Sequence, residues 1–180
     1  MYKKIIVLLV SLGIFLIPNG ANASSHAKSL QNLGMEEIMF AQMMIPHHEQ
    51  AISMSEIALK KSRSEGILKL SRQIKSLQSS EKSQLTYWLK ATGSSMAMDH
   101  DMEMSGMLTV KELSSLKRLT GTQFDRVFLQ LMIKHHQGAL EMLDLISDSS
   151  NAEAKTLAKV INSAQSKEIT SMKLLLNKLK

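Results

Sequence analysis

Apolar residues recur at steps of three and four positions along four long stretches of the chain, with polar residues between them. This spacing places apolar side chains on one face of a helix. It predicts amphipathic helices at about residues 35–61, 65–91, 122–147 and 152–179. These stretches are rich in leucine, isoleucine and methionine and poor in glycine, proline and aromatic residues. The pattern therefore predicts an all-α protein.

A second pattern is superimposed on the first, because much of the chain is written twice. The segment from Met39 to His48 returns 88 residues later as Val127 to His136, and each copy ends in Met-Ile-x-His-His. The motif Ile74-x-Ser76-x-Gln78-x-x-Glu81 likewise returns as Ile161-x-Ser163-x-Gln165-x-x-Glu168. The duplication predicts two antiparallel helical hairpins, repeat one over 34–91 and repeat two over 109–180, packed as a single four-helix bundle.

Three local signals mark where helices bend, begin or end. Pro46 lies inside the first predicted helix and has no N–H for the carbonyl of residue 42, so we expect a kink or a short unwound turn there. Thr109-x-x-Glu112 is a capping box that begins a short helix after the linker over residues 92–108. Gly121 ends that short helix, and Thr122 is expected to begin the next long one.

The first 23 residues are typical of a secretory signal peptide. Lys3 and Lys4 precede an apolar run over residues 5–17, and Ala21-Asn22-Ala23 is a cleavage motif. The run is shorter than the roughly 20 residues that a membrane-spanning helix needs. We expect a protein exported to the periplasm or secreted, with a flexible lead over 24–33 and no stable membrane insertion after cleavage.

Charge and cysteine content limit the kinds of partner and metal site that the protein can have. The formal net charge of +6 falls to +4 without the two lysines of the signal, and the remaining charges alternate in sign along the helices. This alternation is typical of a solvated surface, so nucleic acid is not an expected partner. The chain has no cysteine, which excludes disulfides and thiolate metal sites.

Histidine and methionine are placed together in both copies of the repeat. At 100° per residue, His47 lies within about 40° of Met43 and His48 within about 40° of Met44 on the helical wheel. Adjacent histidines diverge by about 100°, so a second helix must contribute before one ion can be bound by several of them. The candidate metal ligands of the helices are His47, His48, His135, His136, Met39, Met43, Met44, Met54, Met132, Met142 and Met172.

Imidazole and thioether are neutral, fairly soft donors that suit copper(I) and also silver(I). Thioether needs no deprotonation, so protons compete for the histidines alone. The sequence therefore predicts a Cu(I)-binding protein that sequesters or shuttles copper for metal resistance or homeostasis. A competing interpretation treats the methionines as adaptable core residues of a metal-independent helical interaction module with a Met-rich face. A third is a copper oxidase, although the known catalytic motifs are absent and we expect no enzyme activity.

The linker is a second candidate site. Five methionines, one histidine and three acids fall within twelve residues that show almost no helical periodicity and no obvious apolar face. Flexible Met-x-Met spacing lets thioethers surround an ion, and the acids raise the local cation concentration. A plain flexible tether is the alternative. The candidate ligands here are Met96, Met98, His100, Met102, Met104 and Met107.

Two further groups are predicted to act on copper. Cleavage after Ala23 leaves Ser24-Ser25-His26 at the N-terminus, where an amine, two amides and the His26 imidazole can form a square-planar Cu(II) site. Glu81 and Glu168 lie on the inward faces of their helices, where an unpaired carboxylate is costly. We expect both to accept N–H bonds from the ligand histidines and so orient them; the alternative is a surface glutamate facing a lysine.

The doubled motif resembles the family catalogued as domain of unknown function 305, which includes exported copper-binding proteins of the CopM type. The resemblance covers about residues 34–180. It is carried by Met44-Ile45-x-His47-His48-x-x-Ala51-Ile52-x-Met54, by the second copy with Gly138-Ala139, by Gly121-x-x-Phe124-Asp125 and by Gln165-x-x-Glu168-Ile169.

That resemblance implies a ferritin-like four-helix bundle that handles copper through the His-His and neighbouring methionine positions. It also implies metal ions as partners, and a copper efflux or copper-sensing protein. Two departures stand in the first copy, namely Pro46 and the replacement by Gln50 of the glycine found at Gly138. We therefore expect the first copy to be the more distorted.

Replacing the five linker methionines by leucine should lower the number of Cu(I) ions bound, because the thioethers are removed while side-chain volume is kept. The stability of the fold should change little. Stoichiometry measured by Cu(I) titration against a competing chelator tests this, with urea unfolding as the stability measurement. An unchanged stoichiometry would leave the segment as a tether.

Overall fold

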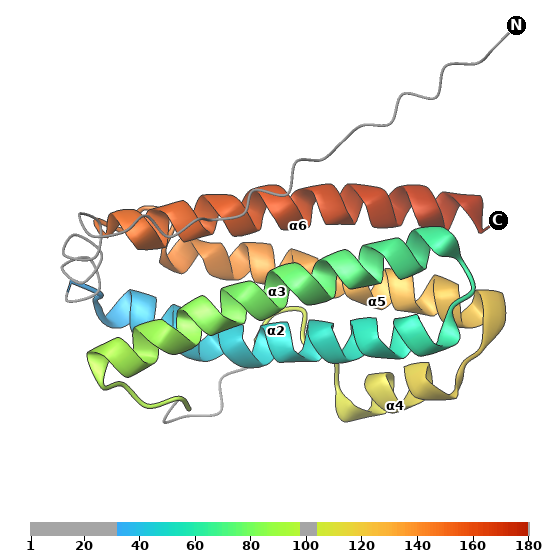
Figure 1. Cartoon of the computed structure of the whole chain (residues 1–180), viewed down its shortest axis with the longest axis horizontal. Helices are drawn as coiled ribbons and strands as arrows, with labels where there is room; N and C mark the ends of the chain where they lie inside the picture. The colour runs from blue at the N-terminus through green and yellow to red at the C-terminus, as the bar shows by residue number, and fades with distance from the viewer. Residues whose placement is uncertain (1–31, 98–103, 180) are drawn as a thin grey trace, which may run out of the picture.

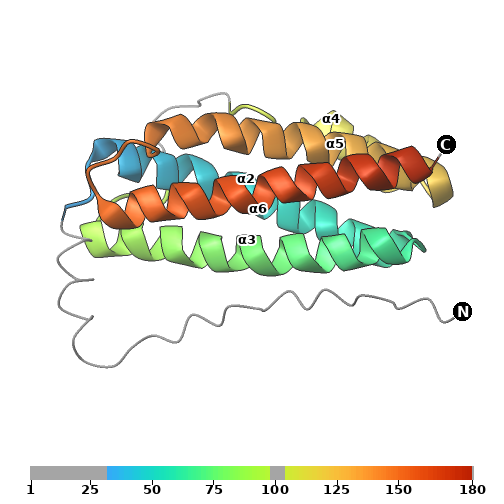
Figure 2. The same cartoon turned by 90° about the horizontal axis from the view of Figure 1, so that it is seen from above.

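Four long helices lie side by side in this computed structural model, which describes residues 32–97 and 104–179 (Figures 1 and 2). Helices α2 (Met35–Lys61) and α3 (Glu65–Thr92) form one antiparallel hairpin. Helices α5 (Gly121–Met142) and α6 (Ala152–Lys178) form the other, joined by a 3-10 turn at Leu143–Leu145. The predicted all-α fold built from two hairpins is confirmed. Among the described residues, no helix has both the length and the apolar character needed to span a bilayer.

The short helix α4 (Val110–Arg118) packs on the outside of the bundle near one end (Figure 1). Its predicted capping box is present, because the Thr109 hydroxyl accepts the Glu112 N–H at 3.2 Å and the Glu112 carboxylate accepts the Thr109 N–H at 2.7 Å. The next helix begins at Gly121, one residue before the predicted start at Thr122. Thr120 is the N-cap of α5. Gly121 has a φ of 58°, a conformation that glycine adopts readily, and it lets the chain change direction between the short helix and α5.

Two further helix predictions need correction. Helix α2 is unbroken at Pro46, so the unwound turn is not formed, and the kink that was the other expectation stays a prediction. Packing of the 27-residue helix along α3 outweighs one missing hydrogen bond. Helix α5 ends at Met142 rather than near residue 147. The chain continues there as a 3-10 turn, which buries Leu143 and Ile146 in the core. Asn151 then begins α6, because its side chain accepts the N–H groups of the first helical turn.

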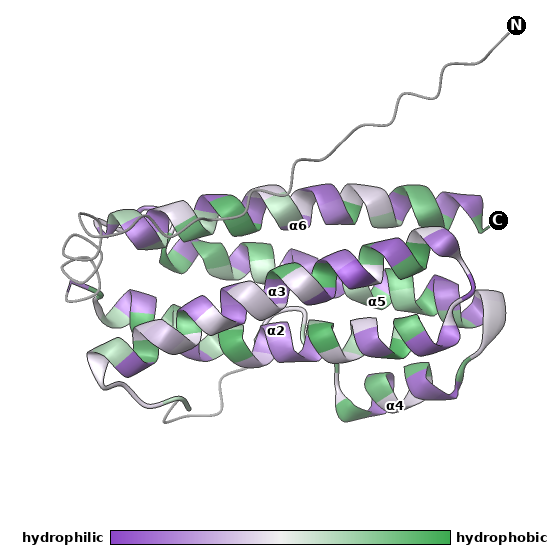
Figure 3. Cartoon of the chain, in the orientation of Figure 1, coloured by the Kyte–Doolittle hydropathy of each residue, from purple (hydrophilic) through white to green (hydrophobic). Residues whose placement is uncertain are grey.

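The core is divided into two apolar clusters by a polar layer. Polar and apolar residues alternate along each long helix (Figure 3). Cluster one contains Phe40, Ala41, Met43, Met44, Ile45, Leu85, Trp88, Leu89, Ala139, Met142, Leu143, Ile146, Ala154, Leu157, Ala158 and Ile161, together with Leu33. Cluster two contains Ala51, Met54, Ala58, Ile67, Leu70, Ile74, Leu108, Leu116, Phe124, Phe128, Leu129, Met132, Ile169 and Met172.

Each long helix passes from one cluster to the other and carries two buried polar residues at the crossing. We call this set the central polar layer. It consists of His47 and His48 on α2, Gln78 and Glu81 on α3, His135 and His136 on α5, and Gln165 and Glu168 on α6.

Candidate metal centre

The four histidines of the central polar layer have no exposed surface. His47 and His135, which are equivalent in the two repeats, lie against each other with ring centroids 3.8 Å apart and planes tilted by 37°. The ring centroid of His136 lies 6.3 Å from that of His135. Adjacent histidines on one helix point in different directions, so a close pair of rings needs a histidine from a second helix. The packing of α2 against α5 provides that pair.

No group of three or more histidines and acids in the described parts of the chain is arranged to hold a metal ion. The layer offers a close histidine pair with two further histidines beside it, so a complete site needs other donors. Methionine sulfur is the soft donor type available in this core. Copper(I) and silver(I) accept thioether and imidazole at low coordination numbers, which fits a pair of histidines better than an octahedral oxygen site does.

Both glutamates of the layer lie beside a histidine, and the predicted hydrogen bond forms in one of the two pairs. Glu168 Oε2 accepts from His136 Nε2 at 2.8 Å, and Glu81 Oε2 lies 2.9 Å from His48 Nε2. The His136–Glu168 pair meets hydrogen-bond angle as well as distance, whereas the His48 N–H is not aligned with Glu81. The two carboxylates are buried, so the alternative of surface glutamates facing lysines is wrong.

A third acceptor comes from the linker. His47 Nε2 lies 3.1 Å from the carbonyl oxygen of Ser105. A carbonyl can only accept, so this contact places the ring proton on Nε2. The buried Nδ1 atoms of His47, His48 and His136 have no hydrogen-bond partner, and neither ring nitrogen of His135 has one. His48 Nε2 also has no hydrogen-bond partner. The Nε2 contacts therefore leave Nδ1 as the nitrogen with a free lone pair in two of the four rings, His47 and His136.

Burial keeps two of the rings neutral. The pKa of His47 is lowered to about 3, mainly by burial and further by the neighbouring His48 and His136, although the Ser105 carbonyl opposes the shift. The pKa of His135 is lowered well below its usual range, again mainly by burial and then by His47, His136 and His48. Neutral imidazole is the form that binds a metal, so both rings are available as ligands at neutral pH.

The bundle methionines lie on both sides of the layer. Met44 and Met132 precede His47 and His135 by three residues, and Met54 and Met142 follow them by seven. These steps correspond to one and two helical turns on the same face. All four are buried, as are Met43 and Met172, whereas Met39 is half-buried against cluster one. The structure places the predicted methionines around the layer, and their binding of a metal stays a prediction.

The linker ligands are placed only in part. Met96 is exposed, while Met104 packs against cluster one and Met107 is half-buried. The expectation that this segment buries no apolar face is wrong at its end, because Leu108 also belongs to cluster two. The other predicted ligands of the linker and N-terminus, namely Met98, His100, Met102 and His26, lie outside the described residues.

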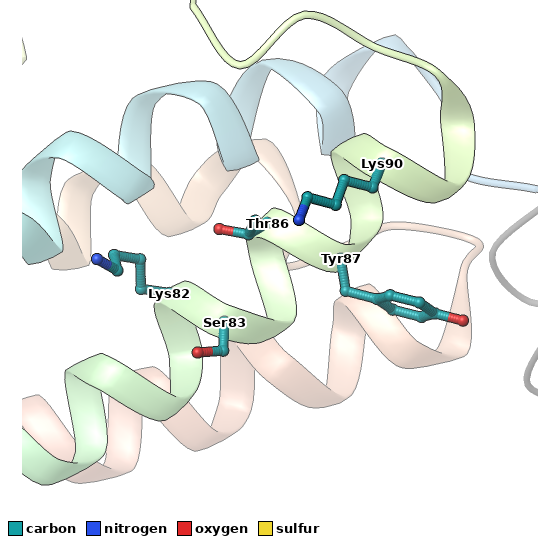
Figure 4. Close-up of a pocket in the computed structure, with 5 residues that line it drawn as sticks. All are labelled: Lys82, Ser83, Thr86, Tyr87 and Lys90. Atoms are coloured by element: carbon teal, nitrogen blue, oxygen red, sulfur yellow. The ribbon is translucent and has the colours of Figure 1, made fainter.

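A surface hollow of about 440 Å³ is formed by side chains of α3, namely Lys82, Ser83, Thr86, Tyr87 and Lys90 (Figure 4). All five come from one helix, and its two charged members are cations. Lysine is a poor neighbour for a metal ion because like charges repel. The central polar layer, and not this hollow, is therefore the candidate metal centre.

Two features of the site were not predicted from the sequence. The side chains of Gln78 and Gln165 are almost completely buried, and neither amide has a hydrogen-bond partner. Their place in the repeated motif, three residues before each glutamate, is the signal that could have identified them. The second feature is the contact between the linker and His47. Its signal in the sequence was that the two repeats differ at one equivalent position, with Gln50 in the first and Gly138 in the second.

These features define a class of protein: an antiparallel four-helix bundle whose core contains a buried histidine layer between methionine-containing clusters. The family described as "Domain of unknown function (DUF305)" matches residues 37–176, and the chain belongs to this family. No curated protein matches the chain.

Solved structures of the same family are similar. A DUF305 fragment from Deinococcus radiodurans is 31% identical with a TM-score of 0.75, covering 81% of this chain and 97% of that one. A DUF305 protein from Streptomyces coelicolor, assumed to be secreted, is 28% identical with a TM-score of 0.76, covering 80% and 93%. CopM in its Cu(I)-bound form is 30% identical with a TM-score of 0.66, covering 79% and 96%. CopM has also been solved with Cu(II) and with silver.

Replacing Glu168 by Gln should weaken Cu(I) binding by about tenfold or more, because the charge that holds the His136 ring in place is lost. Glu81→Gln should have a smaller effect, since its contact with His48 is less well aligned. Glu56→Gln is the matched control: Glu56 is exposed and paired with Lys75 on the surface. Chelator competition measures all three, and equal affinities would contradict the orienting role.

The metal-free protein should lose stability as the pH falls below about 6.5, the ordinary histidine pKa. Unfolded chains take up protons there, while His47 stays neutral in the fold down to about pH 3. The unfolded state therefore binds more protons, and acid favours it by about 1.4 kcal/mol per pH unit for each such histidine.

Urea unfolding between pH 7 and pH 4 measures this dependence. A variant with His47→Leu and His135→Leu corrects for the carboxylates that also titrate in this range. The difference in unfolding free energy between wild type and variant should change steadily with pH. A constant difference would show that the two rings are protonated in the fold as easily as outside it.

Proposed function

We propose that this protein is exported and binds Cu(I), and Ag(I) as a chemical analogue, in order to sequester or shuttle the metal rather than to catalyse a reaction. The observation that carries the proposal is the set of unpaired Nδ1 atoms in a fully buried layer. An unpaired polar atom in a core costs on the order of 1–3 kcal/mol. Four such rings destabilise the metal-free bundle, and a bound metal removes that penalty.

The donor set favours a soft ion. Buried imidazoles lie between two clusters that contain methionine, and among the described residues no cluster of acids is available for a hard cation. CopM, about 30% identical, has been solved with Cu(I), Cu(II) and silver. Its bound metals support the same class of ligand here.

The competing interaction-module hypothesis requires an exposed methionine face. Six bundle methionines are buried in the two clusters, and Met35 and Met96 are the exposed ones among the described residues. The methionines therefore point to an internal role. Export is supported by the sequence of the first 23 residues, and Cu(II) binding at His26 remains a separate hypothesis that depends on cleavage after Ala23.

Changing all four histidines of the layer to alanine should abolish the tightest Cu(I) binding while leaving the bundle helical. Anaerobic competition with a Cu(I) chelator measures the binding, and circular dichroism measures the helix content. The linker variant with leucine for methionine is the control, because it keeps the layer intact. Wild-type affinity in the four-histidine variant would refute the proposal. Loss of the fold in metal-free buffer would show that the histidines are structural.

A further inference from the structure

The end of the Met-rich linker lies directly on the central polar layer. Residues 104–108, which we call the seated turn, form a turn closed by the Met107 N–H and the Met104 carbonyl at 3.2 Å. The Ser105 carbonyl faces His47 Nε2 at 3.1 Å. Gln50, on the same helix as His47, holds the far end of the turn: its amide donates to the Leu108 carbonyl at 2.9 Å and accepts the Leu108 N–H at 2.7 Å.

On the other side, the seated turn rests on the backbone of α5. A Cβ atom at Gly138 would lie 2.1 Å from the Ser105 carbonyl oxygen, so no other residue fits there without moving the turn. Gly106 adopts a φ of 77°, and a Cβ atom there would lie 2.8 Å from the Lys134 carbonyl oxygen. Both positions therefore require glycine for the turn to reach His47.

The two repeats use one equivalent position in opposite ways. Gln50 and Gly138 both follow the second histidine of their motif by two residues. Gln50 binds the turn through its side chain, and Gly138 admits it by having none. A single linker can serve only one of two equivalent histidines. His47 accordingly has the linker carbonyl of Ser105 as an acceptor for Nε2, whereas its counterpart His135 has no such contact with the linker and its ring nitrogens meet no hydrogen-bond geometry.

We propose that the seated turn positions His47 for metal binding, with the Ser105 carbonyl holding the proton on Nε2 so that Nδ1 faces the metal. Gln50, Gly106 and Gly138 are the positioning residues, because they hold the turn in place. The inference rests on the proposed function and adds that the two His-His motifs are not equivalent. Seating of the turn and metal binding at His47 then stabilise each other, because each favours the same tautomer.

Gly138→Ala and Gln50→Ala are the test variants. Alanine at position 138 favours the helix but displaces the turn, and alanine at position 50 removes two hydrogen bonds without adding volume. Gly66→Ala is the matched control: it adds the same methyl group to a helix, where it meets only the flexible end of Leu175. Each variant is measured in two ways, by ¹⁵N NMR of the His47 imidazole in metal-free protein and by Cu(I) affinity under chelator competition.

We expect His47 to be the Nε2–H tautomer in wild type and in Gly66→Ala, and to become a mixture of tautomers in both test variants. Cu(I) affinity should fall by about tenfold in the test variants. Gln50→Glu, which can still accept the Leu108 N–H, should restore part of the loss. When His47 is already replaced by alanine, adding Gly138→Ala should lower the Cu(I) affinity no further.

Three outcomes would overturn the inference. The first is an unchanged His47 tautomer in both test variants. The second is a loss of affinity no larger than in Gly66→Ala. The third is a Gly138→Ala effect that persists without His47. Failure of the proposed function is recognised separately, because wild type would then bind no Cu(I) while the NMR measurement still reports whether the turn orients the ring. If Gly138→Ala does not fold, Gln50→Ala decides.

Discussion

The burial of four imidazole rings at the middle of the bundle is the constraint on which the rest of the structure depends. Every long helix must carry polar groups through the centre of its apolar face, and the core is split into two clusters as a result. Buried rings with unpaired nitrogen atoms favour unfolding. The structure limits this penalty by giving two of the rings an acceptor for Nε2, the Glu168 carboxylate for His136 and the Ser105 carbonyl for His47, and by placing Glu81 2.9 Å from His48 Nε2.

Duplication explains how such a layer can be built. One hairpin supplies an adjacent histidine pair whose side chains diverge, and one glutamate that orients one ring of the pair. The second hairpin brings His135 against His47, which a single hairpin cannot do. Methionines one and two turns away lie on both sides of the layer. Because thioether side chains are unbranched and flexible, they fill the clusters in the metal-free state and can reorient toward an ion.

Helix positions and the Glu–His contacts were predictable because both leave a periodic trace in the sequence. The apolar period places α2 at its observed bounds, and the inward position of Glu168 follows from the same period. The start of α5 was placed too late because Gly121 was interpreted as a break, whereas its positive φ begins the helix. The seated turn was missed because it depends on a backbone carbonyl and on an absent side chain at Gly138. Neither produces a pattern of apolar and polar positions.

The same contacts explain why the layer should discriminate among metals. Glu168 uses one oxygen on His136 and lies 3.4 Å through the other from the Gln73 amide, so its carboxylate is engaged with protein groups. Hard cations need several oxygen ligands. The Glu168 oxygens already have partners, and the two unpaired amide oxygens of Gln78 and Gln165 are too few for such an ion. A soft cation needs only nitrogen and sulfur ligands. The negative charges of the nearby carboxylates offset the cost of burying its positive charge in the core. In the proposed copper site, the carboxylates would thus act through the histidines: they would orient the rings and offset the charge of the ion, while the ligand atoms are nitrogen and sulfur.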